Sequence, residues 1–224
     1  MNKTLSIAVA LALAGLSGVA AAEDMGLEFS GNVAMTTDYV WRGVSQTDED
    51  PAIQGGFDVA HASGAYAGIW GSNIEDWNGA NMEIDYYLGW SGETGPVSLD
   101  IGYLWYTYPD SAPSVDFEEM YIGVSKDFEA VSVGATYSYD FDNENAYWDL
   151  SGSVPVGDFS IAAHYGITDA DAAASDYKDW SIGASTEMGG FGLDLTYFET
   201  DDDGETIYGD LADSRVVFTI SKSL

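Results

Sequence analysis

Two histidines and a dispersed set of carboxylates are the side chains of this sequence with the most obvious capacity for chemistry. A nucleophilic triad needs an imidazole beside a hydroxyl group and an orienting acid, and the chain contains only His61 and His164. His164 falls on the polar face of a predicted strand near Ser160, whereas His61 falls at a predicted turn. A lone histidine on a strand is more often a wall residue than a catalyst, so we expect no catalytic residue. The absence of cysteine excludes disulfides, thiolate metal sites and a thiol nucleophile.

The carboxylates are spread over several predicted strands instead of forming one motif. A ring of carboxylates with few basic partners favours the passage of cations through a channel. The alternative is that the acids are solvated and incidental, because net charge concerns solubility more than specific function. Seven acids are expected to line the interior of a barrel as pore-lining residues: Glu83, Asp85, Asp100, Glu119, Asp140, Asp149 and Asp194.

Arg42 is the one basic residue in the first long predicted loop and the only charged group between Tyr39 and Thr47. We expect its side chain to fold inward, pair with interior acids and form a loop constriction that narrows the pore. The alternative is that the guanidinium group binds backbone carbonyls and caps its own loop. Both interpretations use the planar, permanently charged fork of arginine.

An acidic stretch near the C-terminus loosely imitates a calcium-binding loop. Its oxygen ligands, Glu199, Asp201, Asp203 and Asp210, occupy the first, third, fifth and twelfth places, and Gly204 occupies the sixth. Glutamate replaces the usual first aspartate, and no flanking helices are expected. A bare acidic surface loop is therefore favoured over a metal site, and no cofactor is expected.

The charge balance excludes one class of partner. Six Lys and Arg against 38 Asp and Glu give a formal net charge of −32, whereas nucleic acid is bound by basic groups that displace counterions. Disorder is also excluded, because 46% of the residues are hydrophobic and 14% are aromatic. The acidic loop at 169–178 offers a place where divalent cations could bridge the protein to lipopolysaccharide phosphates.

An apolar period of two indicates the elements that position these groups. In the clearest segment, 82–91, the even positions are apolar and the odd positions are mainly acidic, aromatic or small. Such segments of about ten residues, separated by Gly, Asp, Asn and Pro, are typical of antiparallel strands, and no helix is expected beyond the N-terminal segment. Twelve strands are predicted: 27–37, 52–62, 65–72, 82–91, 97–105, 116–126, 131–141, 145–154, 159–167, 179–187, 191–199 and 214–224.

Periodicity alone does not say which face points outward, because a soluble lipocalin-like barrel and an outer-membrane barrel differ in this respect. The polar face consists of Gly, Ser, Ala, Thr and acids with almost no Lys, which suits a small lumen better than a soluble surface. Connections also alternate in the rhythm of periplasmic turns and extracellular loops. The short turns are 62–64, 92–96, 127–130, 155–158 and 188–190, and the longer loops are 38–51, 73–80, 109–115, 142–145, 169–178 and 200–213.

Bulky aromatic residues gather in two bands, as membrane interfaces select. The alternative, that aromatics merely favour strands, explains their number but not this clustering. The band at the long-loop ends contains Tyr103, Trp105, Tyr137, Tyr139, Trp148, Tyr165, Trp180 and Tyr197, and the band at the short turns contains Trp90, Phe159 and Phe191.

The N-terminal segment has the three parts of a secretory signal peptide. A short basic start is followed by an apolar run over 5–19 and by the small residues 20–22. We expect two regions, a cleaved signal peptide at 1–22 and an outer-membrane β-barrel domain at 23–224. No later apolar stretch has the length of a membrane-spanning helix.

Two neighbouring stretches carry a family resemblance. The stretch Asp38–Gln46 reads DYVWRGVSQ, and Asp50–Asp58 reads DPAIQGGFD. Together they resemble the opening motif of the TorF-type porin family of proteobacteria, conserved outer-membrane proteins of unknown function. The resemblance implies a porin-like outer-membrane barrel and supplies no substrate or active site. The last strand departs from the usual pattern of such proteins, because it ends in Leu224 instead of Phe and Lys222 interrupts its apolar row.

These observations predict an all-β protein, an antiparallel transmembrane β-barrel of about twelve strands with short periplasmic turns and longer acidic extracellular loops. It is expected in the outer membrane of a Gram-negative bacterium, in contact with lipids and lipopolysaccharide, as a non-enzymatic porin-like channel for small cationic or neutral solutes. One alternative is a non-conducting structural or adhesive barrel whose acidic loops bind divalent cations, and the third is a lipid-modifying enzyme. The sequence does not distinguish a monomer from a homo-oligomer, because trimeric porins present apolar strand faces to each other much as they do to lipid.

Overall fold

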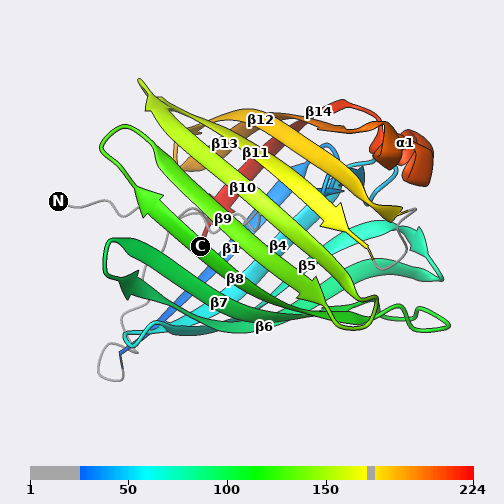
Figure 1. Cartoon of the computed structure of the whole chain (residues 1–224), viewed down its shortest axis with the longest axis horizontal. Coiled ribbons are helices and arrows are strands. Elements are labelled where there is room, and N and C mark those ends of the chain that lie inside the picture. The colour runs from blue at the N-terminus through cyan, green and yellow to red at the C-terminus, as the bar shows by residue number, and fades with distance from the viewer. Residues whose placement is uncertain (1–25, 171–174) are drawn as a thin grey trace.

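Twelve antiparallel strands form the wall of a closed barrel, as expected (Figure 1). The computed structural model describes residues 26–170 and 175–224, so the expected signal peptide at 1–22 and Asp171 lie outside the described residues. The wall strands are β1 (Leu27–Thr36), β4 (Ala52–His61), β5 (Ala65–Trp77), β6 (Ala80–Thr94), β7 (Val97–Thr107), β8 (Phe117–Asp127), β9 (Ser132–Asp140), β10 (Asn145–Val156), β11 (Phe159–Asp169), β12 (Tyr177–Met188), β13 (Phe191–Thr200) and β14 (Arg215–Ser223).

Each wall strand pairs with its neighbours in the chain, and the first strand closes the ring against the last. β1 pairs with β14 from Asn32 opposite Ser223 to Thr36 opposite Thr219. The backbone N–H of Leu224 extends this seam by donating to the carbonyl of Gly31 at 2.9 Å. Closure leaves no unpaired strand edge in the wall, which is the arrangement that an apolar surrounding requires.

The apolar face of the sheet points outward and the polar face points inward. Phe57 is 67% exposed and Ile53 is 63% exposed, whereas Asp85 and Glu119 are only 2% and 3% exposed. The arrangement is opposite to that of a water-soluble barrel, which buries its apolar side chains. The period of two in the sequence therefore becomes an apolar outer surface around an acidic interior.

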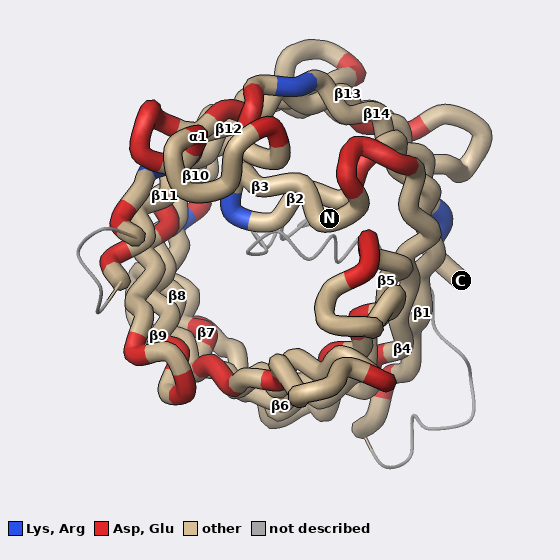
Figure 2. Tube along the Cα trace, turned by 90° about the vertical axis from the view of Figure 1, so that its right-hand side faces the viewer, with Lys and Arg blue, Asp and Glu red and all other residues tan. Residues whose placement is uncertain are grey.

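The two ends of the barrel differ in their connections. Tight turns with left-handed glycines join the strands at one end, for example Gly95 with φ of 66° and Gly157 with φ of 64°. The long connections lie at the other end, where acidic segments are prominent (Figure 2). The connections there include a small hairpin of β2 (Val40–Trp41) and β3 (Val44–Ser45), the helix α1 (Asp202–Tyr208) and the 3-10 turn η3 (Gly209–Ala212).

Two expectations about the loops are wrong. The region expected to contain only loop at 200–213 forms α1 and η3, because Asp201 caps the helix by accepting from the backbone N–H of Gly204 at 3.2 Å. The expected loop at 73–80 is mostly strand, since β5 continues to Trp77 and β6 begins at Ala80. Within the described residues, no helix has the length and apolar character needed to cross a membrane.

Candidate functional site

The seven acids expected in the lumen all lie at inward positions of their strands, but in different surroundings. Glu83, Asp85, Glu119 and Asp140 are buried, and the other three are partly buried. These carboxylates also differ in their hydrogen-bond partners. Asp140 accepts from Asn143 Nδ2 at 2.6 Å and so closes its own loop, whereas Asp194 accepts from Thr196 Oγ1 at 2.7 Å.

The β2–β3 hairpin folds into the mouth of the barrel and carries Arg42 with it (Figure 2). Arg42 Nη2 donates to both carboxylate oxygens of Glu119 on β8, at 2.8 Å each. The guanidinium carbon lies 4.2 Å from the ring centroid of Trp41 and 4.1 Å from that of Tyr147 on β10. The Arg42 carbonyl accepts from Tyr177 Oη on β12 at 3.1 Å. One loop residue therefore contacts three strands of the wall, β8, β10 and β12.

Electrostatics keep the residues of this hairpin in defined protonation states. Burial alone would lower the pKa of Arg42, but the negative charge of Glu119 raises it, and the net result is a pKa above the ordinary value. Burial also raises the pKa of Tyr39, and the nearby carboxylates Glu83 and Asp85 raise it further. Arg42 stays charged and Tyr39 stays neutral across the physiological pH range.

A second arginine anchors the base of the same loop. Arg215 Nη1 donates to Asp38 Oδ2 at 2.9 Å, and both side chains are buried. Asp38 also accepts from Ser45 Oγ at 2.6 Å and Thr47 Oγ1 at 2.9 Å. This cluster was missed by the sequence reasoning, although Asp38 opens the DYVWRGVSQ stretch. Asp38 thus fixes the hairpin that presents Arg42.

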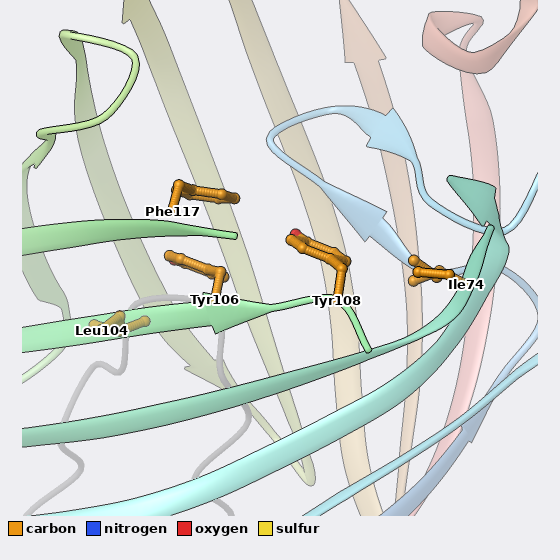
Figure 3. Packing of buried hydrophobic residues seen from close by; sticks show 6 residues of the cluster. Ile74, Leu104, Tyr106, Tyr108 and Phe117 are labelled. Atoms are coloured by element: carbon orange, nitrogen blue, oxygen red, sulfur yellow. The ribbon is translucent and has the colours of Figure 1, made fainter. Parts of the chain in front are cut away.

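Part of the inner wall that faces the hairpin is apolar instead of polar. Buried Ile74, Leu104, Tyr106, Tyr108 and Phe117 form a cluster on β5, β7, β8 and the segment after β7 (Figure 3). The rings of Tyr106 and Phe117 stack with centroids 4.3 Å apart. Side chains of the hairpin, among them that of Trp41, pack on this cluster. Hydrophobic packing therefore holds the hairpin in the lumen together with the arginine contacts.

Three acids lie at the level of this cluster, and Arg42 is their one basic partner among the described residues. Arg42 pairs with Glu119, and Tyr108 Oη donates to Glu83 at 3.1 Å. Asp85 lies two residues after Glu83 on the same face of β6, and its Oδ1 is buried without a hydrogen-bond partner. The mouth of the lumen consequently carries an excess of carboxylates over basic groups.

On the opposite wall, His164 lies between two carboxylates. Its Nδ1 bonds to Asp149 on β10, and its Nε2 lies 2.6 Å from Oδ1 of Asp179 on β12. Tyr147 Oη donates to Asp179 at 3.2 Å. Asp179 is 1% exposed and was missed by the sequence reasoning, although its odd position on the predicted strand places it on the polar face. His61, in contrast, bonds to Ser63 beside a tight turn.

The weak metal candidates near the C-terminus are not brought together. Asp201 caps α1 and also accepts from the backbone N–H of Lys178 at 3.1 Å, whereas Glu199 accepts from Tyr197 Oη at 2.5 Å. Asp203 lies within α1 and Asp210 within η3. In the part of the chain that the structure describes, no group of three or more imidazole, thiolate or carboxylate side chains is placed to hold a metal ion.

The closed wall, the apolar exterior and the acidic interior define a porin-like β-barrel. Residues 20–224 match a family described as bacterial protein of unknown function (Gcw_chp), and the chain belongs to this family. The match does not carry the TorF-type designation suggested by the sequence resemblance. A comparison with curated protein sequences found no match.

Solved structures share the architecture at very low sequence identity. The KdgM porin superposes with a TM-score of 0.61 and 6% identity, covering 87% of this chain and 97% of KdgM. The KdgM porin in complex with disordered oligogalacturonate gives a TM-score of 0.61 and 7% identity, covering 88% and 99% of the two chains. At such identities the similarity concerns the fold.

Proposed function

We propose that this protein is an outer-membrane channel that lets small cationic or neutral solutes diffuse through its lumen. The observation that carries the proposal is the inverted barrel, in which apolar side chains cover the outside and carboxylates face inward from many strands. An apolar exterior needs a lipid surrounding, and a ring of acids attracts cations and repels anions. The pore-lining residues proposed are Glu83, Asp85, Asp100, Glu119, Asp140, Asp149 and Asp194.

Arg42 is proposed to form the constriction of this channel. Its contacts with Glu119 on β8, Tyr147 on β10 and Tyr177 on β12 support a crossbar near the mouth. A single positive charge held by a carboxylate leaves the surrounding acids in excess. The crossbar therefore limits the size of the solute more than it changes the sign of the lumen.

The acidic lumen also bears on the solute class. The related fold of KdgM holds an oligogalacturonate, which is a chain of carboxylate-bearing sugars. The inward acids proposed here would repel such a polyanion, and few basic groups offset them. We therefore expect small cations and neutral molecules to pass while acidic oligosaccharides are excluded.

A non-conducting structural barrel is the second candidate, and the inserted hairpin favours it. Trp41 and the buried cluster around Tyr106 and Phe117 fill part of the mouth with apolar side chains. A lipid-modifying enzyme has less support, because both ring nitrogens of His164 are engaged by carboxylates and neither is bonded to a hydroxyl group. We accordingly propose no catalytic residue.

Export and membrane placement complete the proposal. Removal of residues 1–22 would leave a chain that begins at Glu23 and inserts as one domain in the outer membrane of a Gram-negative bacterium. Outer-membrane lipid and lipopolysaccharide are then its surroundings, with divalent cations between phosphates and the acidic loops. A homo-oligomer that buries part of the apolar exterior is compatible with this placement.

Liposome swelling tests the channel directly. Purified protein is reconstituted into liposomes, which are diluted into isotonic solutions of a neutral sugar or an acidic oligosaccharide. We expect rapid swelling with the neutral solute and slow swelling with the acidic one. Liposomes that contain correctly inserted protein but swell no faster than empty ones would favour the non-conducting barrel.

A further inference from the structure

Three tyrosines lie flat against the inner wall between β5 and β8, each over a glycine of the neighbouring strand. Tyr87 stands opposite Gly68 on β5, and Tyr66 stands opposite Gly89 on β6. A Cβ atom at either glycine would lie far inside van der Waals contact with the tyrosine that covers it. One face of each ring is therefore pressed on backbone, and the ring plane follows the wall.

The third pair has the same geometry. Tyr121 on β8 stands opposite Gly102 on β7, and a Cβ atom at Gly102 would lie 2.5 Å from Tyr121 Cζ. The three tyrosines are only partly buried although they point into the lumen. Tyr87 and Tyr121 also pack against the buried cluster around Tyr106 and Phe117, and the exposed parts of the three rings form an aromatic surface along one side of the interior.

Two carboxylates hold the hydroxyl groups of these rings. Tyr87 Oη donates to Asp58 on β4. Tyr66 Oη donates to Asp100 at 2.7 Å, Tyr121 Oη donates to the same oxygen at 3.3 Å, and the two hydroxyls bond to each other. These bonds fix the rings in place and keep two negative charges at the edge of the aromatic surface.

The basic residues of the described chain are engaged elsewhere. Arg42 pairs with Glu119, Arg215 pairs with Asp38, and His164 pairs with Asp149 and Asp179. Lys178 pairs with Asp201. Lys126 lies over the ring of Phe128 and Lys222 over that of Phe191, both near the short turns. Within residues 26–170 and 175–224, Asp58 and Asp100 therefore have tyrosine partners and no basic one.

The surroundings of Arg42 show that aromatic rings together with a carboxylate can bind a cation in this protein. Its guanidinium lies over the rings of Trp41 and Tyr147 and is neutralised by Glu119. Ring faces and a carboxylate together hold a cation because the ring quadrupole adds to the ionic attraction. The tyrosine surface offers the same two kinds of group with no cation of the chain on them.

We propose that the surface formed by Tyr66, Tyr87 and Tyr121 with Asp58 and Asp100 is a binding subsite for small organic cations, such as amines with methyl or methylene substituents. The ring faces contact the apolar substituents and attract the charge, and the carboxylates neutralise it. A small inorganic ion uses only the carboxylates, because it keeps its water shell. Since a subsite in the lumen requires a conducting lumen, the inference rests on the proposed function.

Block of single-channel potassium current by tetramethylammonium tests the subsite in the full-length protein in a planar bilayer. Tyr66→Leu and Tyr121→Leu remove a ring, Tyr66→Phe and Tyr121→Phe keep it, and Tyr165→Leu removes a ring from the outer surface as a matched control. Each lumen Leu variant should raise the half-blocking concentration about fivefold, the effect of one cation–π contact. The Phe variants and Tyr165→Leu should stay within about twofold of wild type.

Asp100→Asn, which keeps all three rings, provides a second variant in case a Leu variant fails to insert. It should also weaken the block, because it removes the charge that neutralises the cation. Potassium current that tetramethylammonium does not block, or blocks equally in all variants, would overturn the subsite and leave the channel intact. Equal block by a neutral sugar with the same variant dependence would assign the surface to saccharides instead. Absence of any potassium current would overturn the channel itself, and the subsite with it.

Discussion

Replacement of Arg42 by alanine is expected to release the β2–β3 hairpin from the lumen. The side chains of Arg42 and Glu119 are 11% and 4% exposed, and two 2.8 Å contacts join them. Removal of one partner of a buried pair leaves an uncompensated charge, at a cost of about 3 kcal/mol. That cost corresponds to about a hundredfold change in the ratio of inserted to released hairpin. Release lets water reach Glu119 and widens the mouth.

Single-channel recording measures this effect through three variants. Arg42→Ala should give a larger and noisier conductance with stronger cation preference, because one positive charge is lost and Glu119 becomes accessible. Arg42→Lys keeps the charge and should stay closer to wild type. In the double variant Arg42→Ala, Glu119→Gln neither member of the pair is charged, so its conductance should lie nearer wild type than that of the single variant. Equal conductance and reversal potential in Arg42→Ala and wild type would refute the crossbar.

Further predictions concern the lumen acids, the histidine and the glycine contacts. Asp85→Asn combined with Asp100→Asn should reduce cation preference, and an unchanged reversal potential in a salt gradient would remove both from the pore lining. His164→Ala leaves two carboxylates without their shared partner and should destabilise the barrel by about 3 kcal/mol, seen as a lower temperature of heat modification on gels. Lipid hydrolysis that depended on His164 would contradict the non-enzymatic proposal. Gly102→Val should lower the same temperature because its side chain meets the ring that lies over it, whereas Gly152→Ala, with ordinary contacts, should be tolerated.

The strands could be predicted because their pattern is set by a simple constraint. A wall with lipid on one face and a lumen on the other alternates apolar and polar side chains with a period of two. Short turns are expected where antiparallel strands that are neighbours in the chain also pair in the wall. β5 and β6 extend past their expected ends because they continue to pair with each other up to Trp77 opposite Ala80. This part of the two strands has no alternation of apolar and polar residues. The existence of each strand was therefore easier to predict than its end.

The filling of the mouth could not be predicted from periodicity. Leu104 and Tyr106 occupy inward positions of β7, where a polar face was expected, because the β2–β3 hairpin covers them. The β2–β3 hairpin and β7 are far apart in sequence, and the apolar–polar alternation of either segment does not indicate that they touch. Arg42 pairs with the interior acid Glu119, and the composition favours such a pair because few basic residues compete for the many carboxylates.

The short helix illustrates a signal that was present but weak. Asp201 followed by Asp202, Asp203 and Glu205 is an N-cap with an acidic first turn, which favours a helix start. A helix of seven residues is marginal without tertiary contacts, so composition alone favoured a loop. Packing of Tyr208 against Tyr177, with ring centroids 5.4 Å apart, supplies one such contact.

Single-channel recording of the purified, heat-modifiable protein in a planar bilayer under an asymmetric salt gradient shows whether the lumen conducts and prefers cations. We expect discrete current steps whose reversal potential lies toward the equilibrium potential of the cation. A silent bilayer that contains properly inserted protein would contradict the channel, and a reversal potential toward the anion would contradict the role of the inward carboxylates.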